Sequence, residues 1–168
     1  MIIAETKRLV IRHFELKDAT YILNQLNQDS FIRYIADKNV RTQSDAEKYL
    51  EEGPLASYKW HGFGLNMVLL KESGAAIGMC GLVKRDELEH PDLGYACLPE
   101  YWSKGYSFEA SEAVLRNARK VHGIQTVLGV THPDNEASNK LLMKLGFQQV
   151  KTIDLYGSIN NLYKYDSI

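Results

Sequence analysis

Twice in the second half of the chain a strand-like run is followed by a polar turn and then by a helix-like run, and this order constrains the fold most. The two strand-like runs are residues 93–98 and 126–131. The helical stripes that follow them consist of Ala110, Val114, Ala118 and Val121, and of Ala137, Leu141 and Leu145. If the two strands are parallel neighbours, both turns lie at one edge of a sheet, where open sheets bind cofactors.

The beginning of the chain predicts one strand and two helices. Residues 8–14 alternate in the manner of an opening strand, and apolar residues recur at helical spacing over residues 19–26. Residues 44–47 have the spacing of a capping box that opens a second helix. The Gly-Pro pair at residues 53–54 is expected to end that helix or to mark its frayed end.

Three short apolar runs then follow one another with turn-like separators, which predicts an antiparallel meander. These runs are residues 64–70, 75–83 and 93–98, and two closing strands are expected at residues 147–153 and 159–165. The pattern predicts one mixed α+β domain over residues 1–168, built around a central sheet.

Charge and composition argue against several classes of function. Lys and Arg number 20 against 21 Asp and Glu, so no basic surplus favours nucleic acid or an anionic membrane as a partner. The apolar runs are too short to cross a bilayer, and charges near the N-terminus do not suit a secretory signal. Cys80 and Cys97 form no disulfide framework, and neither they nor the five histidines show metal-ligand spacing. We expect a soluble, cytoplasmic protein without a metal.

The first of the two turns, residues 99–107, is suited to an anion such as a diphosphate. A strand that passes through a tight turn into a helix leaves backbone N–H groups unpaired, and the helix dipole adds partial positive charge. Gly105 allows a close backbone approach or a positive φ, and Lys104 adds a cation. The alternative is an ordinary connection, since a single glycine does not make the dinucleotide fingerprint. Glu109 either stabilises the helix start or repels a phosphate, depending on where its side chain points.

The second turn, residues 133–138, places polar groups at another helix entrance. Asn135 is a natural N-cap, and Ser138 falls in the first turn of the helix. By itself this segment is a plain helix start, and only the pairing with the first turn points to a shared ligand.

These segments together resemble the GNAT superfamily of acyl-CoA N-acetyltransferases, and within it the branch of ribosomal-protein N-terminal acetyltransferases. The residues that carry the resemblance are LGYACLPEYWSKGYSFEA at 93–110, NEAS at 135–138, KLGF at 144–147, ETKRL at 5–9 and the Ile-Gly step at 77–78. The resemblance implies a three-layer fold with a twisted, mostly antiparallel central sheet, helices on both faces and a splayed parallel strand pair at the cofactor site. It also implies acetyl-CoA as the cosubstrate.

The resemblance assigns cofactor contacts residue by residue. The diphosphate would rest on the turn formed by Trp102, Ser103, Lys104, Gly105, Tyr106 and Ser107, and the pantetheine arm would pair with Ala96, Cys97 and Leu98. Asn135, Ser138 and Lys144 complete the expected set. The branch often carries glycine where Ser103 stands, so this chain departs from its pattern there.

Acetyl transfer to an amine needs a neutral amine, a stabilised oxyanion and a proton for the departing thiolate. The resemblance implies Ser138 as the proton donor, because the tyrosine that many superfamily members use is replaced by Leu142. Asp92 is the candidate base, with a solvated hairpin residue as the alternative. A backbone N–H near Cys97 or Leu98 is the candidate oxyanion donor, and the Cys97 thiol itself is expected to be packing.

The acceptor is either a protein N-terminus or a small-molecule amine. An α-amine has a pKa of about 8, against about 10.4 for lysine, so it needs only modest base catalysis. Phe31, Tyr34, Phe63 and Tyr95 are the candidates for contacting it, although aromatic residues in this number also build cores. A non-catalytic acyl-CoA-binding module is the rival hypothesis, and the chain is expected to be a monomer or a homodimer.

Overall fold

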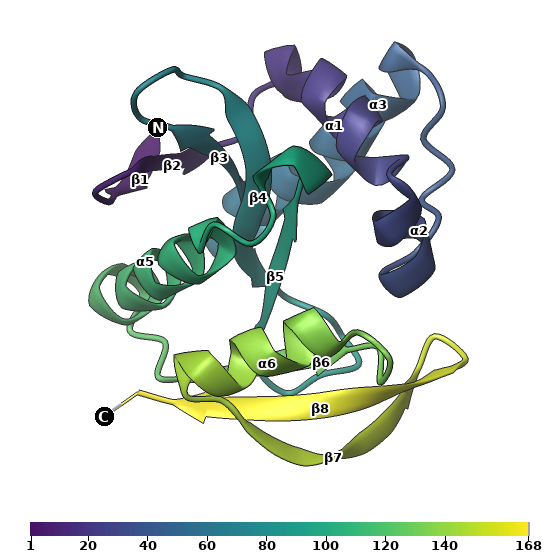
Figure 1. The fold of residues 1–168 in the computed structure, drawn as a ribbon, viewed down its shortest axis with the longest axis vertical. Coiled ribbons are helices and arrows are strands. Elements are labelled where there is room, and N and C mark those ends of the chain that lie inside the picture. Colours follow the sequence, from purple (N-terminus) through teal and green to yellow (C-terminus); the bar gives the residue numbers. More distant parts are fainter. Residues whose placement is uncertain (168) are drawn as a thin grey trace.

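The computed structural model, described for residues 1–167, is a three-layer α+β fold around an eight-stranded sheet (Figure 1). The strands are β1 (Ile2–Glu5), β2 (Leu9–His13), β3 (Leu65–Leu70), β4 (Ala76–Val83), β5 (Asp92–Cys97), β6 (Thr126–Thr131), β7 (Gln148–Leu155) and β8 (Ser158–Asp166). The helices are α1 (Ala19–Leu26), α2 (Asp29–Tyr34), α3 (Gln43–Leu50), α4 (Ala56–His61), α5 (Tyr106–His122) and α6 (Glu136–Leu145). The sheet order is β1-β2-β3-β4-β5-β6-β8-β7.

The pair of β5 and β6 is parallel, whereas the other neighbouring strands are antiparallel. Their ladder consists of one register pair, Asp92 with Leu128, beside a bond from the Leu128 N–H to the Pro91 carbonyl. Beyond these residues the strands diverge, and the β6-β8-β7 part of the sheet turns away from β3-β4-β5 (Figure 1). The expected splayed parallel pair is therefore confirmed.

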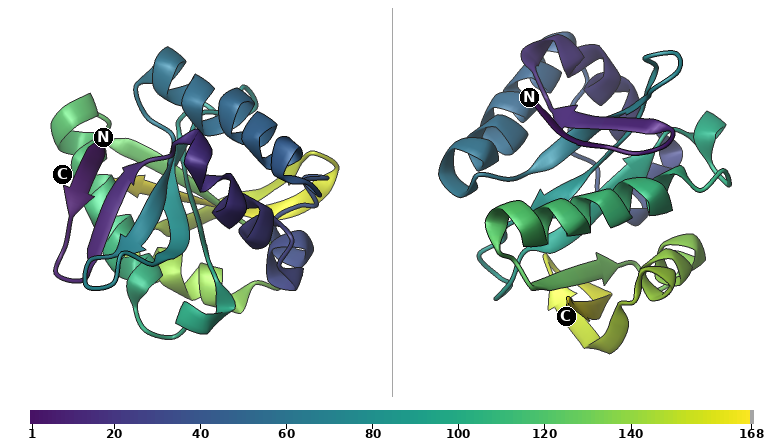
Figure 2. Two further views of the ribbon diagram at one scale, coloured as in Figure 1. Left: turned by 90° about the horizontal axis from the view of Figure 1, so that it is seen from above. Right: turned by 90° about the vertical axis from the view of Figure 1, so that its left-hand side faces the viewer.

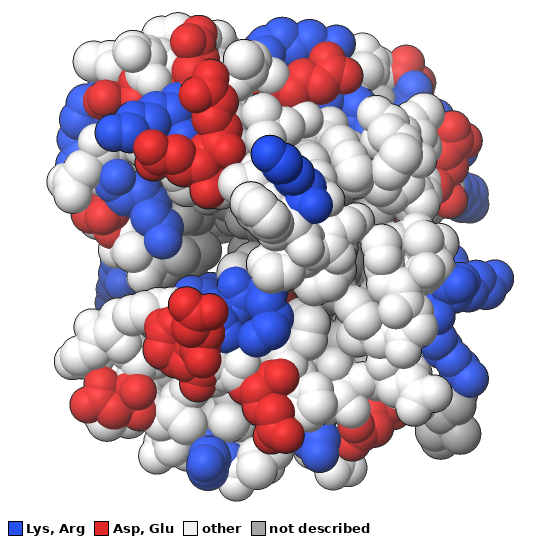
Figure 3. Space-filling model, turned by 180° about the vertical axis from the view of Figure 1, so that it is seen from behind, with Lys and Arg blue, Asp and Glu red and all other residues white. Residues whose placement is uncertain are grey.

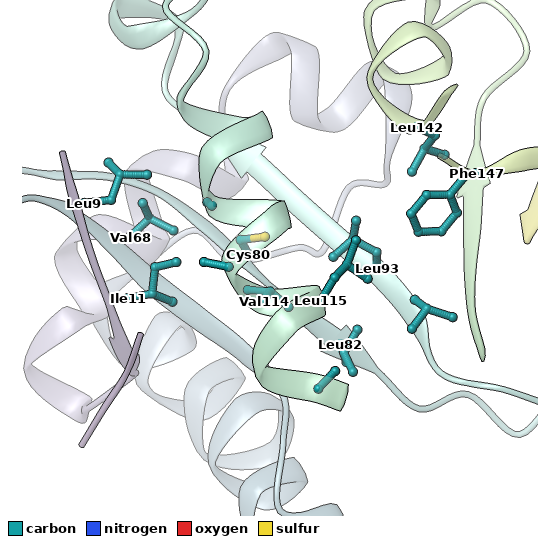
Figure 4. Close-up of a cluster of buried hydrophobic side chains, with 14 of the residues drawn as sticks. Leu9, Ile11, Val68, Cys80, Leu82, Leu93, Val114, Leu115, Leu142 and Phe147 are labelled. Carbon is teal, nitrogen blue, oxygen red and sulfur yellow. The ribbon is translucent and has the colours of Figure 1, made fainter. Parts of the chain in front are cut away.

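Helices cover both faces of the sheet, with α5 on one face and α1 and α3 on the other (Figure 2). The face under α5 holds the larger apolar core, in which Val114 and Leu115 of α5 pack near Cys80 and Leu93 of the strands (Figure 4). The core on the opposite face is built from α1, α2 and α3 with residues such as Met67 of β3. Successive side chains along a strand point to opposite faces of the sheet, so the same strands contribute residues to both cores.

The meander and the helix–strand order are confirmed, but the first helices differ from expectation. The capping box belongs to Thr42 and Asp45 rather than to residues 44–47, and α3 begins at Gln43. The Gly-Pro pair does not end the helix, because a π-helical turn, Glu51–Leu55, joins α3 to α4. Proline lacks the N–H of a normal helical bond, and a widened turn accommodates that loss without breaking the helix.

Two apolar stripes are shifted relative to the sequence pattern. Val121 is 66% exposed, so the buried face of α5 ends with Ala118. On α6 the buried anchor is Leu142, whereas Ala137 is exposed. Gly129 of β6 makes room for Leu142, because a Cβ there would lie 2.8 Å from its Cδ1 atom. No helix among residues 1–167 is long and apolar enough to span a membrane.

Candidate active site

The free edge of β5 faces the gap that opens toward β6. The antiparallel ladder pairs Ala96 with Met79, and the Leu98 N–H donates to the Ile77 carbonyl at 2.9 Å. Because backbone groups alternate in direction along a strand, the N–H groups of Tyr95 and Cys97 point to the opposite edge. The expectation that Leu98 could supply the oxyanion donor is therefore wrong, because its N–H already donates to another strand of the sheet. The Cys97 N–H keeps the orientation that this role needs.

The turn before α5 has a backbone that leaves the helix entrance open. Gly105 stands at the N-cap position with φ +82°, and the helix start has no side-chain cap. The first bond of the helix runs from the Glu109 N–H to the Gly105 carbonyl, so the preceding amide groups are available to an anion. Ser103 has φ +61°, the left-handed conformation that glycine adopts most readily. This conformation explains why glycine suits that position in the branch that the chain resembles.

The start of α6 differs, because it is capped. The Asn135 Oδ1 atom accepts the Ser138 N–H at 3.3 Å, which leaves the Asn135 amide nitrogen for another partner. The Ser138 hydroxyl lies 2.7 Å from the Tyr95 hydroxyl. Burial raises the pKa of Tyr95, so its phenol remains protonated at neutral pH. The two hydroxyls therefore form a hydrogen-bonded pair in which both groups hold a proton. The pair joins β5 to α6 across the parallel strands.

Tyr95 and Asp92 lie on opposite faces of β5. Leu93 and Tyr95 pack with the core under α5, whereas Ala96 packs with the core under α1 and α3. Asp92 is an even number of residues from Ala96, so it shares the α1 and α3 face. The expected catalytic residues Asp92 and Ser138 are thus separated by the strand itself.

Asp92 is buried rather than solvated, with 2% of its surface exposed. Its Oδ1 atom accepts the Arg85 Nε–H at 2.8 Å, and its Oδ2 lies 3.4 Å from Arg85 Nη2. Burial raises the pKa of Asp92, while Arg85 opposes that rise. Arg85 also lies beneath Tyr156 of the β7-β8 turn, 5.8 Å from the ring centre. Residue spacing gave no indication of Arg85, because its pairing with Asp92 depends on the path of the β4-β5 loop and its contact with Tyr156 joins distant parts of the chain.

The remaining cofactor candidates gather around the start of α5. The Trp102 indole donates to the Cys97 carbonyl at 2.8 Å and folds the turn against the end of β5. Lys144 of α6 lies over the Phe108 ring of α5, 4.5 Å from its centre. Cys97 and Ser107, together with Ala96 and Tyr106, line a small cavity between β4, β5 and α5.

The Cys97 thiol is suited to packing. Burial, with a smaller effect of Glu100, raises its pKa to about 11, and a protonated thiol is a poor nucleophile. Cys80 is fully buried in the core. Within residues 1–167, no cluster of three or more His, Cys, Asp or Glu side chains has a metal-binding arrangement.

The four acceptor candidates do not form one group. Phe31 is 3% exposed within the core under α1, and Phe63 packs between His61 and His122 near the end of α5. Tyr34 makes an edge contact with His132 at the end of β6, with ring centres 5.7 Å apart. Tyr95 faces Ser138.

A groove on the α3 side was not expected from the sequence. It runs between the α3-to-α4 helix and the ends of β3 and β4, and its lining includes Tyr49, Pro54, Trp60, Val83 and Lys84. Figure 3 views the molecule from behind and shows a hollow near the middle of this face, with basic and acidic side chains interspersed around it. Val83, which lines the groove, is the register partner of Asp92.

Comparisons with known proteins identify the family of this chain. Residues 8–148 match the model of the acetyltransferase (GNAT) domain family. The uncharacterized N-acetyltransferase YoaA of Bacillus subtilis is 28% identical over 156 residues, which cover 92% of this chain and 87% of YoaA.

Solved structures share the fold over nearly the whole chain. The acetyltransferase from Agrobacterium tumefaciens superposes with a TM-score of 0.85 at 18% identity, covering 98% of this chain and 94% of that one. RimL, a ribosomal L7/L12 α-N-protein acetyltransferase in complex with coenzyme A, gives a TM-score of 0.83 at 15% identity, covering 99% and 98% of the two chains. The chain belongs to the GNAT acetyltransferase family.

Proposed function

We propose that this protein transfers the acetyl group of acetyl-CoA to a primary amine, either a protein N-terminal α-amine or a small-molecule amine. The observation that carries the proposal is β5, which has a free backbone edge beside an open helix start, a hydroxyl pair on one face and a buried carboxylate on the other. The coenzyme A complex of the similar RimL supports the choice of cosubstrate.

The residues around the turn would hold the cosubstrate, which supplies an activated acetyl thioester. The open amides after Gly105 and the ammonium of Lys104 would receive the diphosphate. The free edge of β5 would pair with the pantetheine amides, and the Asn135 amide nitrogen would add a donor. These groups fit because they are polar, because Cys97 of β5 and Ser107 of the turn line one cavity, and because the turn amides precede the first bonded residue of α5.

Each step of the transfer has a candidate group. The Cys97 N–H would stabilise the negative charge that develops on the acetyl oxygen. The Ser138 and Tyr95 pair would deliver a proton to the departing sulfur on the cofactor face. Asp92, through a bound water, would accept the proton that the attacking amine loses on the other face. The groove lined in part by Val83, the register partner of Asp92, would lead the amine to that point.

The pairing of Asp92 with Arg85 favours a second candidate, an acyl-CoA-binding module without catalysis. A carboxylate that accepts hydrogen bonds from a guanidinium has less capacity to take a proton, because the pairing stabilises its charged form.

One assay separates the two candidates. Thiol release from acetyl-CoA is followed with a panel of small amines and of peptides with free N-termini, and cofactor binding is followed by thermal stabilisation. We expect thiol release that depends on the added amine. Stabilisation by acetyl-CoA without turnover on any acceptor supports the binding module, and neither stabilisation nor turnover contradicts both.

A further inference from the structure

Glu109, in the first turn of α5, is held by the turn between β1 and β2. Its Oε2 atom accepts the Thr6 hydroxyl at 2.5 Å and the Arg8 backbone N–H at 3.0 Å. Its Oε1 accepts the Arg8 Nε–H at 2.7 Å. The side chain is therefore held against the β1-β2 turn, and the Thr6 and Arg8 contacts come from a segment about a hundred residues earlier in the sequence.

Arg8 also directly contacts the turn of residues 102–107 that is proposed to bind the diphosphate, called the diphosphate turn below. Its Nη1 donates to the Lys104 carbonyl at 2.9 Å, and its guanidinium carbon lies 4.4 Å from the centre of the Tyr106 ring. A Cβ on Gly105 would lie 3.4 Å from Nη2. One side chain thus contacts Lys104 and Tyr106, which flank Gly105, and the carboxylate of Glu109.

The charges of Glu109 and Arg8 would affect how strongly the turn binds a diphosphate. A free Glu109 carboxylate near the helix entrance would repel a polyanion, whereas Arg8 compensates its charge. Burial alone would raise the pKa of Glu109, but the hydrogen bonds from Thr6 and Arg8 lower it, so the carboxylate is ionised at neutral pH. The compensation therefore matters under the conditions in which the protein works.

We infer that Arg8 is a positioning residue for the diphosphate turn, because it ties the Lys104 carbonyl and the Glu109 carboxylate to the β1-β2 turn. It fixes the turn in the shape that binds the anion and neutralises the acid beside it. The inference rests on the proposed binding of acyl-CoA and extends it to a residue outside the turn itself.

The test compares coenzyme A with pantetheine, which lacks the diphosphate, by NMR titration of the purified full chain. Arg8→Met removes both arms, and Arg8→Lys keeps the charge but not the planar donor set. Lys71→Met is the control, because the Lys71 side chain pairs with Glu5 at 3.5 Å, and the substitution keeps the backbone bond from the Lys71 N–H to the Arg8 carbonyl. Melting temperatures are recorded for each variant.

We expect Arg8→Met to weaken coenzyme A binding about tenfold, a change of about 1.4 kcal/mol, and to leave pantetheine binding unchanged. Arg8→Lys should recover only part of the loss, and Lys71→Met should bind both ligands normally. Equal weakening of both ligands, or full recovery in Arg8→Lys, overturns the positioning role. A wild-type chain that binds no coenzyme A overturns the proposed function, whereas normal binding in Arg8→Met overturns this inference alone.

Discussion

Replacing Ser138 with alanine should slow acetyl transfer without weakening cofactor binding. The Ser138 hydroxyl lies 2.7 Å from that of Tyr95 and would donate its proton to the departing thiolate. A positioned general acid contributes about 10²- to 10⁴-fold to a rate. A thiol has a pKa of about 8.5, so a thiolate departs more readily than an alkoxide and depends less on protonation.

The expected loss in kcat is therefore at the lower end, about 10²-fold, which corresponds to about 2.7 kcal/mol of barrier. The stability cost should be about 1 kcal/mol, because the Tyr95 hydroxyl loses its partner. Alanine favours the helix, and the cap by Asn135 is kept because it uses the backbone N–H of residue 138. Tyr95→Phe should lose less, since it removes the partner and not the donor.

The assay is steady-state thiol release with a saturating amine, beside a separate measurement of coenzyme A affinity. Ser73→Ala is the matched control, because that hydroxyl accepts the Ala75 N–H at 3.2 Å in the β3-β4 turn, away from the site. A Ser138→Ala kcat within about twofold of wild type would remove Ser138 from the mechanism, because general-acid catalysis is worth far more than that.

Three further variants test other parts of the reasoning. Gly105→Val should abolish thermal stabilisation by coenzyme A, because φ +82° strains a β-branched residue; stabilisation equal to wild type would contradict the turn assignment. Asp18 pairs with Arg12 at 2.8 Å, and although burial raises its pKa, these hydrogen bonds lower it overall. Its stabilisation is thus present above the unfolded pKa of about 3.9 and lost as pH falls, so Asp18→Asn should lower the unfolding free energy by about 1–3 kcal/mol at pH 7 and by little near pH 2 in urea titrations. Gly129→Ala should cost about 1–3 kcal/mol by crowding Leu142, and less in a Leu142→Ala background; equal costs in a double-mutant cycle would refute the contact.

Local sequence signals predicted the second half of the chain well. The helices α5 and α6 each follow a strand through a turn and end at a glycine with positive φ, Gly123 and Gly146. A glycine that ends a helix acts through a few neighbouring residues, so the local sequence is enough to predict the helix end. The strand β6 was predicted at its observed bounds for the same reason.

The first helices show where local signals fail. Thr42 with Asp45 and residues 44–47 both have capping-box spacing, and only the first pair forms the box. The alternatives overlap, and tertiary packing of the helix selects between them. A proline normally ends a helix, but here the π-helical turn accommodates Pro54. Helix propensity alone does not predict this arrangement.

The site contacts that escaped prediction depend on tertiary structure rather than on local spacing. Arg8 and Glu109 are 101 positions apart. Arg85 is only seven positions from its partner Asp92, yet that pairing depends on the loop path and on burial. A spacing rule detects partners on one helix or strand, and so it located the turn and the cap but not the side chains that orient them.

The division of chemistry across β5 follows from parity along the strand. Asp92 and Tyr95 are three residues apart, an odd separation that sets their side chains on opposite faces. The amine and the leaving sulfur can then be served from different sides, with the backbone edge of the same strand between them. A one-residue insertion between these positions would bring both groups to one face. The spacing of these two residues is therefore a stricter requirement of the proposed mechanism than the identity of the residues between them.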